Sequence, residues 1–293
     1  MFFGTNNNHL DNPPWNACMI CHSEMEYFFS KEYLSEPYFS MTKDIGKFDF
    51  YKCRHCDFVF SKTHYELSEK RWEKLNSDLH YYLEENFTVD DYFKEGNMRA
   101  PDYLQHALGI VLLVKNDIIN STNMLDYAAG YGCLSKILKK YFDIHLYNFD
   151  PYCQSEELSY VFPNESMKFD VVINSALFEH IRDRSDIDKI NNLVAEDGCL
   201  ILHTVICERI PKDPDWFFVG VPVHSAFHTN KSMDILMKQW NYVSSIYSPV
   251  SKCWVLFKKE PDSIHEKVDL INEETKERYF YYKKGFVDYW KGF

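Results

Sequence analysis

Apolar and polar positions alternate along the central part of the chain in a way that predicts strands and helices in turn. Residues 124–126, 144–150 and 169–174 each run from mostly apolar side chains into a polar or acidic one. Short apolar runs of this kind are typical of strands buried in a parallel sheet. A longer apolar run at 107–114 predicts a buried helix before the first strand. The pattern therefore predicts a doubly wound α/β domain.

The second half of the chain is expected to continue the same sheet. An apolar run at 199–204 predicts another strand. A helix is expected over 231–240, with its N-cap near Thr229 or Asn230. Two short strands within 242–257 are expected to complete the sheet as an antiparallel pair.

The segment Asp126-Tyr-Ala-Ala-Gly-Tyr-Gly132 joins the first predicted strand to a helix-forming run. Gly130 and Gly132 permit positive φ angles and let a ligand approach the backbone, and the following helix directs unpaired N–H groups toward it. Asp150 stands about twenty residues further on, at the end of the next strand, where a carboxylate can accept hydrogen bonds from ribose hydroxyls. These positions predict a site for a nucleotide-like ligand.

Together with Phe-Asp-Val-Val at 169–172 and Glu-His-Ile at 179–181, these motifs resemble the class I S-adenosylmethionine-dependent methyltransferases over roughly residues 100–258. The resemblance implies a Rossmann-like, seven-stranded sheet and S-adenosylmethionine as the cofactor. It places the cofactor contacts at the following residues of this sequence: Asp126, Ala128, Gly130, Gly132, Asp150, Asn174 and Ser175.

Two features depart from the pattern of that family. Ala128 stands where the family has its first glycine, and because alanine disfavours a strongly positive φ, a slightly shifted turn is expected. The gap from Asp150 to Phe169 leaves little room for the usual third strand, so no adenine contact is assigned there. An NAD-dependent oxidoreductase is disfavoured because no third glycine follows Gly132 at the required spacing. Another doubly wound fold with a different function is the remaining alternative.

Two Cys-x-x-Cys pairs lie near the N-terminus, Cys18 with Cys21 and Cys53 with Cys56. Four thiolates in this arrangement can hold one Zn²⁺ tetrahedrally, so a zinc-ribbon-like module with a structural Zn²⁺ is expected. A disulfide framework and a redox pair are the alternatives. The first residues lack the basic start and apolar core of a secretory signal, and the other cysteines are scattered singly, which favours a reducing cytoplasm.

Four histidines fall where the strand ends are expected to gather: His180, His203, His224 and His228. The ordinary pKa of histidine lies near 6.5, so an imidazole there can take the proton of an acceptor hydroxyl. We expect His180, and after it His224, to be the catalytic base, with Glu179 orienting His180. The alternatives are a structural role for each histidine and a divalent ion held by Glu179 and His180.

Composition limits the partners that the chain can have. It has 293 residues, a formal net charge of −12 and a sequence pI near 5.5. Nucleic acid is bound by clustered Lys and Arg, so the acidic balance disfavours it as the main partner. No apolar run approaches the ~20 residues that cross a bilayer, and no membrane contact is expected.

These anchors divide the chain into four parts. A zinc-binding module is expected at 1–62, a helical linker that forms a cleft wall at 63–98, a methyltransferase domain at 99–260 and an aromatic-rich extension at 261–293. Burial of each aromatic ring is worth about 1.5–3 kcal/mol, so the extension is expected to dock on this chain or on a second subunit of a homo-oligomer. Stacking on RNA is the alternative role for these rings.

The sequence thus predicts methyl transfer to a hydroxyl of a small polar acceptor. A zinc module followed by a methyltransferase domain resembles bacterial enzymes that act on sugars or nucleotide-linked sugars in surface-polysaccharide and natural-product biosynthesis. It also resembles ribosomal RNA methyltransferases, so an rRNA or tRNA methyltransferase that grips RNA with the zinc module is the first alternative. A non-catalytic protein that binds S-adenosylmethionine is the second.

Overall fold

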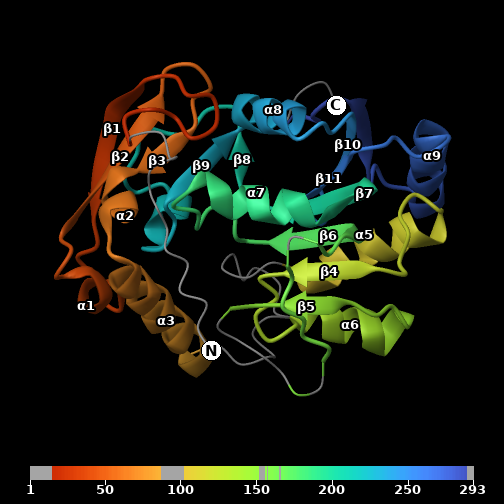
Figure 1. Ribbon diagram of the computed structural model, residues 1–293, viewed down its shortest axis with the longest axis horizontal. Helices are drawn as coiled ribbons and strands as arrows, with labels where there is room; N and C mark the ends of the chain where they lie inside the picture. The colour runs from red at the N-terminus through yellow and green to blue at the C-terminus, as the bar shows by residue number, and fades with distance from the viewer. Residues whose placement is uncertain (1–14, 87–101, 152–155, 157, 165, 289–293) are drawn as a thin grey trace.

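The computed structural model describes residues 15–86, 102–151, 156, 158–164 and 166–288. Within these residues the chain forms a seven-stranded sheet and a five-stranded sheet, which lie beside each other in Figure 1. No helix in this part of the chain is both long and apolar enough to cross a membrane.

The described elements follow one another as strands and helices of short to moderate length. The strands are β1 (Met25–Glu32), β2 (Lys47–Cys53), β3 (Val59–Ser61), β4 (Met124–Tyr127), β5 (Tyr147–Phe149), β6 (Phe169–Ser175), β7 (Val194–His203), β8 (Ile206–Cys207), β9 (Ala226–Thr229), β10 (Ser244–Ser248), β11 (Cys253–Phe257) and β12 (Tyr281–Lys284). The helices are α1 (Tyr38–Thr42), α2 (Lys62–Glu66), α3 (Glu69–Asn86), α5 (Tyr103–Lys115), α6 (Cys133–Phe142), α7 (Arg184–Leu193), the 3₁₀ helix η2 (Phe217–Gly220), α8 (Asn230–Gln239) and α9 (Ile264–Thr275).

The seven-stranded sheet has the strand order β12-β10-β11-β7-β6-β4-β5. Strands β5, β4, β6 and β7 run parallel to one another. Strands β11, β10 and β12 continue the sheet with antiparallel pairings. The Rossmann-like, seven-stranded sheet expected from the sequence is confirmed, and so is the antiparallel pair at 242–257.

Two strands differ from the sequence expectation. Strand β5 begins only at Tyr147, and the residues Ile144 and Leu146 before it are buried in the hydrophobic core. The seventh strand is β12, which comes from the C-terminal extension. After β5, Tyr160 makes one isolated parallel bridge with Asn148. The residues that follow Asp150 therefore pair with β5 only through this one bridge. At the other side of the sheet, β12 of the C-terminal extension is the outermost strand.

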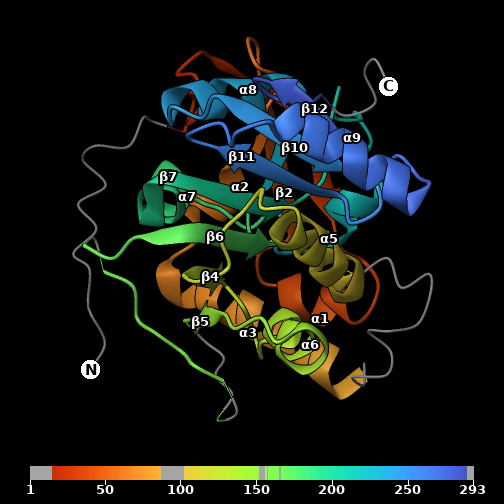
Figure 2. The ribbon, with the colours of Figure 1, turned by 90° about the vertical axis from the view of Figure 1, so that its right-hand side faces the viewer.

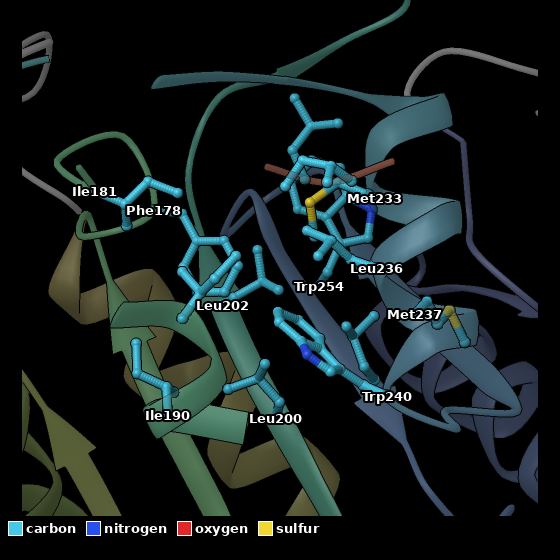
Figure 3. Packing of buried hydrophobic residues seen from close by; sticks show 14 of the residues in the cluster. Phe178, Ile181, Ile190, Leu200, Leu202, Met233, Leu236, Met237, Trp240 and Trp254 are labelled. Atoms are coloured by element: carbon cyan, nitrogen blue, oxygen red, sulfur yellow. The ribbon is translucent and has the colours of Figure 1, made fainter. Parts of the chain in front are cut away.

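Helices cover both faces of this sheet because successive side chains of a strand point to opposite faces. On one face, Leu200 and Leu202 of β7 pack in a cluster with Leu236 of α8, as Figure 3 shows. On the other face, Ile173 and Ile201 pack in a cluster with α5, α6 and α9, the helices turned toward the viewer in Figure 2. The central strands β6 and β7 are thus buried on both sides.

The five-stranded sheet, with the order β1-β2-β3-β9-β8, joins N-terminal residues to a segment from the second half of the chain. Val59 of β3 lies opposite Phe227 of β9, and Phe60 lies opposite Ala226. The Phe50 and Phe227 rings stack with centroids 5.5 Å apart. Sequence analysis did not identify β1 or β9. The cysteine-bearing residues and the later segment therefore share one sheet.

Two helices matter for the site described below. Helix α8 begins at Asn230 with Thr229 as its N-cap, as expected, and Ser232 completes a capping box. In the linker, Leu75 of α3 packs in a cluster with Val223. Residues 87–98 of the predicted linker lie outside the described residues. Helix α3 thus supports the chain just before His224.

The described part of the C-terminal extension docks on its own chain. The ring of Phe286 stacks on that of Trp254, with centroids 6.0 Å apart and an interplanar angle of 13°. The indole Nε1 of Trp254 donates a hydrogen bond to the carbonyl oxygen of Val287 at 3.0 Å. Together with β12, these contacts make the extension part of the main core.

Replacing Phe286 by alanine tests this packing. Its side chain is only 2% exposed, so Phe286→Ala is expected to lower the free energy of unfolding by about 3–5 kcal/mol. Urea denaturation measures the change. Phe162→Ala, at a ring that is 69% exposed, serves as control and is expected to change stability by less than about 0.5 kcal/mol. Equal effects of the two substitutions would contradict a core role for the extension.

Candidate active site and metal centre

The turn between β4 and α6 contains three residues with positive φ angles, Ala128 at 65°, Gly130 at 55° and Gly132 at 72°. The structure differs from the expected shifted turn, because Ala128 itself adopts the left-handed conformation that a glycine would take. That conformation costs a residue with a Cβ about 1–2 kcal/mol. A Cβ at Gly132 would lie 2.2 Å from Cδ1 of Leu158, so the backbone passes close to that side chain.

Hydrogen bonds hold this turn against the end of β5. The backbone amides of Ala128 and Ala129 both donate to the carbonyl oxygen of Phe149, at 2.7 and 3.0 Å. The amide of Gly130 donates to Oδ2 of Asp150 at 2.9 Å. Asp150 therefore links the strand end to the glycine turn, and the ribose contact suggested for it stays a prediction.

Polar side chains follow the ends of the neighbouring strands. Asp126 of β4 is buried, and burial, followed by the charge of Asp150, raises the pKa of Asp126 to about 7. Asn174 of β6 donates from Nδ2 to the carbonyl oxygen of Tyr127 at 2.9 Å, while its Oδ1 is buried without a protein partner. Strands β5, β4 and β6 are adjacent and parallel, so their carboxyl ends lie on the same side of the sheet. All the residues predicted to contact the cofactor, Ser175 included, therefore lie at the carboxyl ends of these strands.

Glu179, His180 and His224 come together beyond the carboxyl end of β6. Glu179 and His180 lie in the loop that follows that strand, whereas His224 lies between η2 and β9. One carboxylate oxygen and one nitrogen from each ring lie within 4.8 Å of one another. The two imidazole rings have centroids 5.0 Å apart. The structure therefore places the three residues predicted to be catalytic in one cluster.

Burial keeps the histidines of this cluster neutral. Burial raises the pKa of Glu179 to about 7, even though Oγ1 of Thr204 donates to its Oε2 at 2.8 Å and favours the carboxylate. Burial lowers the pKa of His224 to about 4. Burial also holds the pKa of His180 well below its ordinary value, with the charge of His224 as the second cause. Both imidazoles are therefore unprotonated at neutral pH, and each ring keeps one nitrogen with a free lone pair.

Hydrogen bonds fix the two segments of the cluster against each other. The amides of Ser225 and Ala226 donate to the carbonyl oxygen of Glu179 at 2.7 and 3.1 Å. His224 donates from Nδ1 to the carbonyl oxygen of Phe218 at 2.6 Å, because a carbonyl can only accept. Nε2 of a neutral His224 therefore keeps its lone pair.

The other two histidines considered as bases lie elsewhere. The His203 ring lies 4.8 Å from that of His106 on α5, and Nδ1 of His106 lies 3.4 Å from Oγ of Ser175. The His228 ring is buried 5.0 Å from the ring of Phe58. The other ring contact of His228 is with Phe178, next to Glu179, and its Nε2 lies 3.2 Å from the carbonyl oxygen of Phe178. Neither His203 nor His228 belongs to the cluster of Glu179, His180 and His224.

The four cysteines of the N-terminal pairs form a second cluster. The Sγ atoms of Cys18 and Cys56 are 3.6 Å apart, those of Cys21 and Cys53 are 3.4 Å apart, and those of Cys21 and Cys56 are 3.6 Å apart. A tetrahedral Zn²⁺ with Zn–S bonds of about 2.3 Å separates its sulfurs by about 3.8 Å. The donor set and its spacing therefore suit a metal ion that prefers thiolates.

This thiol cluster supports the segment that carries His224. Oγ1 of Thr229 donates to the carbonyl oxygen of Cys56 at 2.6 Å. The buried ring of His64 donates from Nε2 to the carbonyl oxygen of Pro222 at 2.8 Å. These contacts and the β3–β9 pairing hold both ends of the chain around His224.

Sequence reasoning missed two residues that shape the cluster. Thr204 is 4% exposed and donates a hydrogen bond to Glu179. Its place at the end of the strand predicted over 199–204 was the available signal. His64 lies in an aromatic region whose pattern gave no sign of its contact with Pro222.

Replacing Ala128 by glycine tests the strain in the turn. Ala128→Gly is expected to raise the free energy of unfolding by about 1 kcal/mol, because glycine adopts the positive φ without a penalty. Thermal or urea unfolding measures the difference. Ala129→Gly is the matched control; Ala129 has no positive φ, so this change is expected to destabilise by about 0.5–1 kcal/mol. Destabilisation by both changes would show that Ala128 is not strained.

Comparison with known proteins agrees with these observations. The family described as "Methyltransferase domain" matches residues 72–249. No curated protein matches the sequence. The matched residues include the glycine turn, the end of β5 and the Glu179–His180–His224 cluster.

Several solved structures are similar to this chain at low sequence identity. The plantazolicin methyltransferase BpumL, in complex with a pentazolic desmethylPZN analog and SAH, is 8% identical, with 65% of this chain and 94% of that chain covered and a TM-score of 0.44. DesVI of Streptomyces venezuelae is 12% identical, with 66% and 99% covered and a TM-score of 0.41. The magnesium protoporphyrin IX methyltransferase of Synechocystis PCC 6803, with bound SAH, is 16% identical, with 62% and 97% covered and a TM-score of 0.37. Since the family match spans more than half of the chain, this protein belongs to the methyltransferase-domain family and is an S-adenosylmethionine-dependent methyltransferase.

Proposed function

We propose that this enzyme transfers the methyl group of S-adenosylmethionine to a hydroxyl of a small polar acceptor, a sugar or a nucleotide-linked sugar. The observation that carries the proposal is the Glu179–His180–His224 cluster, a carboxyl group and two neutral imidazoles beyond the end of β6. In open α/β sheets, ligands bind outside the carboxyl ends of the strands. The formal net charge of −12 supports a small acceptor over a nucleic acid.

The chemistry asks mainly for positioning and proton removal. The sulfonium of the cofactor supplies a methyl group that is already activated, so the protein must hold the acceptor oxygen in line with it. With the cofactor bound, the acceptor oxygen would attack the methyl carbon, the carbon–sulfur bond would break with its electron pair left on sulfur, and the hydroxyl proton would pass to a base of the protein. A free imidazole of His180 or His224 is able to take that proton, and an ionised Glu179 would stabilise the imidazolium formed.

We also propose that Cys18, Cys21, Cys53 and Cys56 hold a structural Zn²⁺. Metal binding to four thiolates contributes directly to folding, because the unfolded chain has no preformed site. The bound metal would also stabilise the segment that carries His224, through the β3–β9 pairing and the Thr229–Cys56 hydrogen bond. Free thiols of this kind suit a reducing compartment such as the cytoplasm.

The proposed reaction is tested with isotopically labelled S-adenosylmethionine and three acceptor classes: free sugars, nucleotide-linked sugars and structured RNA. Labelled methyl transfer to a sugar hydroxyl, located by NMR, is the expected result. Transfer to RNA alone would replace the proposed acceptor. Cofactor binding without transfer to any class would favour a binding protein.

Alanine at His180 or at His224 is expected to lower turnover at least 100-fold, because each removes a group that acts on the acceptor hydroxyl. Isothermal titration should show the dissociation constant for S-adenosylmethionine unchanged within about threefold, since neither residue belongs to the glycine turn. His145→Ala, at a side chain that is 68% exposed, is the control and should keep full turnover. Full turnover in both cluster variants would contradict their role.

Cys53→Ser is expected to remove one equivalent of zinc per chain and to lower both thermal stability and turnover, while cofactor affinity changes little. Zinc is measured by atomic emission and stability by calorimetry. Cys207→Ser, at a half-buried thiol in the same five-stranded sheet, is the matched control and should retain zinc. The same number of zinc equivalents in Cys53→Ser as in the wild type would exclude the four-thiolate site.

A further inference from the structure

The side chains of Glu179, His180 and His224 beyond β6 can also donate three ligand atoms to a cation. A carboxylate oxygen of Glu179 and a ring nitrogen from each of His180 and His224 lie within 4.8 Å of one another. Two imidazoles and one carboxylate occupy three positions of a tetrahedral or octahedral ion and leave the others open. We infer that this cluster binds a divalent transition-metal ion whose open position takes the acceptor hydroxyl.

The orientation of His224 favours metal binding. Its Nδ1 donates to the carbonyl oxygen of Phe218 at 2.6 Å, which fixes both the tautomer and the ring plane. Metal-binding histidines characteristically donate their second ring N–H to a carbonyl or carboxylate in this way. Nε2 is left with a lone pair, and the ring cannot turn without losing the Phe218 hydrogen bond.

The surroundings of Glu179 point the same way. The side chain is 3% exposed, and none of the ion pairs in the described part of the chain involves it. Oγ1 of Thr204 donates to its Oε2 at 2.8 Å and so orients the carboxyl group. A buried carboxyl group is stabilised either by protonation or by an opposite charge close by, and a cation among the three donors would supply that charge. The backbone hydrogen bonds from Ser225 and Ala226 keep this segment in place.

The donor atoms define the class of ion. Nitrogen from imidazole with one carboxylate oxygen suits Zn²⁺, Fe²⁺, Co²⁺, Ni²⁺ or Mn²⁺ better than Ca²⁺. The site differs in kind from the four-cysteine cluster, whose donors are all sulfur. The two sites can therefore be told apart by spectroscopy in one sample.

The role of the ion, unlike its binding, rests on the proposed function. A cation held by these three residues would lower the pKa of a coordinated acceptor hydroxyl. The hydroxyl proton would then pass to water, and the new oxygen–carbon bond would replace the carbon–sulfur bond, whose electron pair stays on sulfur. In the metal-loaded enzyme, His180 and His224 are then ligands and not free bases. Turnover would accordingly depend on a metal other than the one held by the cysteines.

Cobalt titration of the full chain, after removal of bound metal by a chelator, tests the inference. The wild type should take up two equivalents of Co²⁺: one with intense thiolate-to-cobalt bands in the near ultraviolet, the other with weak visible bands only. His180→Ala and Glu179→Gln should keep the thiolate bands and bind the second equivalent at least tenfold more weakly. Thr204→Val should weaken that second site about 10–100-fold, because it removes only the orienting hydrogen bond.

Glu179→Gln is the decisive variant, since glutamine keeps the shape of a protonated, purely structural Glu179. His145→Ala is the control and should bind both equivalents. A single equivalent in the wild type, or an unchanged second site in Glu179→Gln, would overturn the inference. Methyl transfer by enzyme that holds a metal ion only at the four cysteines would also overturn the inference, and it would leave the proposed function intact. Two bound ions without any methyl transfer would instead contradict the proposed function alone.

Discussion

Parallel pairing of β6 with β7 is the constraint on which the site depends. Ser175 lies opposite His203 at the ends of the two strands, so the chain leaves both strands at the same edge of the sheet. Glu179 and Thr204 meet there at 2.8 Å although 25 positions separate them in the sequence. Because both strands are buried on both faces, a slip of one residue would exchange the side chains of the two helical layers. Apolar packing thus fixes the positions of the polar groups.

Backbone strain gathers at the same edge. Ala128 after β4 and Ala176 after β6 both have positive φ angles, 65° and 59°. Each amide is tied to the next strand: Ala128 donates to Phe149 at 2.7 Å and Ala176 donates to His203 at 2.9 Å. Non-glycine residues persist in this conformation only where the surroundings impose it. The rigid sheet therefore sets the shape of both loops that leave it.

Much of the fold and of the site could be predicted from local signals. The strands around Asp126 and Asn174, the N-cap at Thr229 and the four-cysteine cluster each follow from a short pattern or a fixed spacing. The pairing of β3 with β9 and the place of β12 in the sheet could not be predicted, since they depend on partners distant in the sequence. Thr204 shows the same limit, because its role depends on the hydrogen bond to Glu179, which is distant in the sequence. The positive φ of Ala128 is imposed by hydrogen bonds to β5 that no propensity encodes.

The five-stranded sheet also carries a consequence for the order of folding. Val59 and Phe227 are neighbours in space, so β3 exposes an unpaired edge from its synthesis until β9 has been made. Contacts between such distant residues close slowly, because the intervening loop must lose its entropy first. Until then, the backbone N–H and C=O groups of β3 that later pair with β9 stay unpaired beside aromatic side chains. Unpaired strand edges of this kind favour aggregation. An N-terminal fragment that ends before β9 would keep that edge permanently.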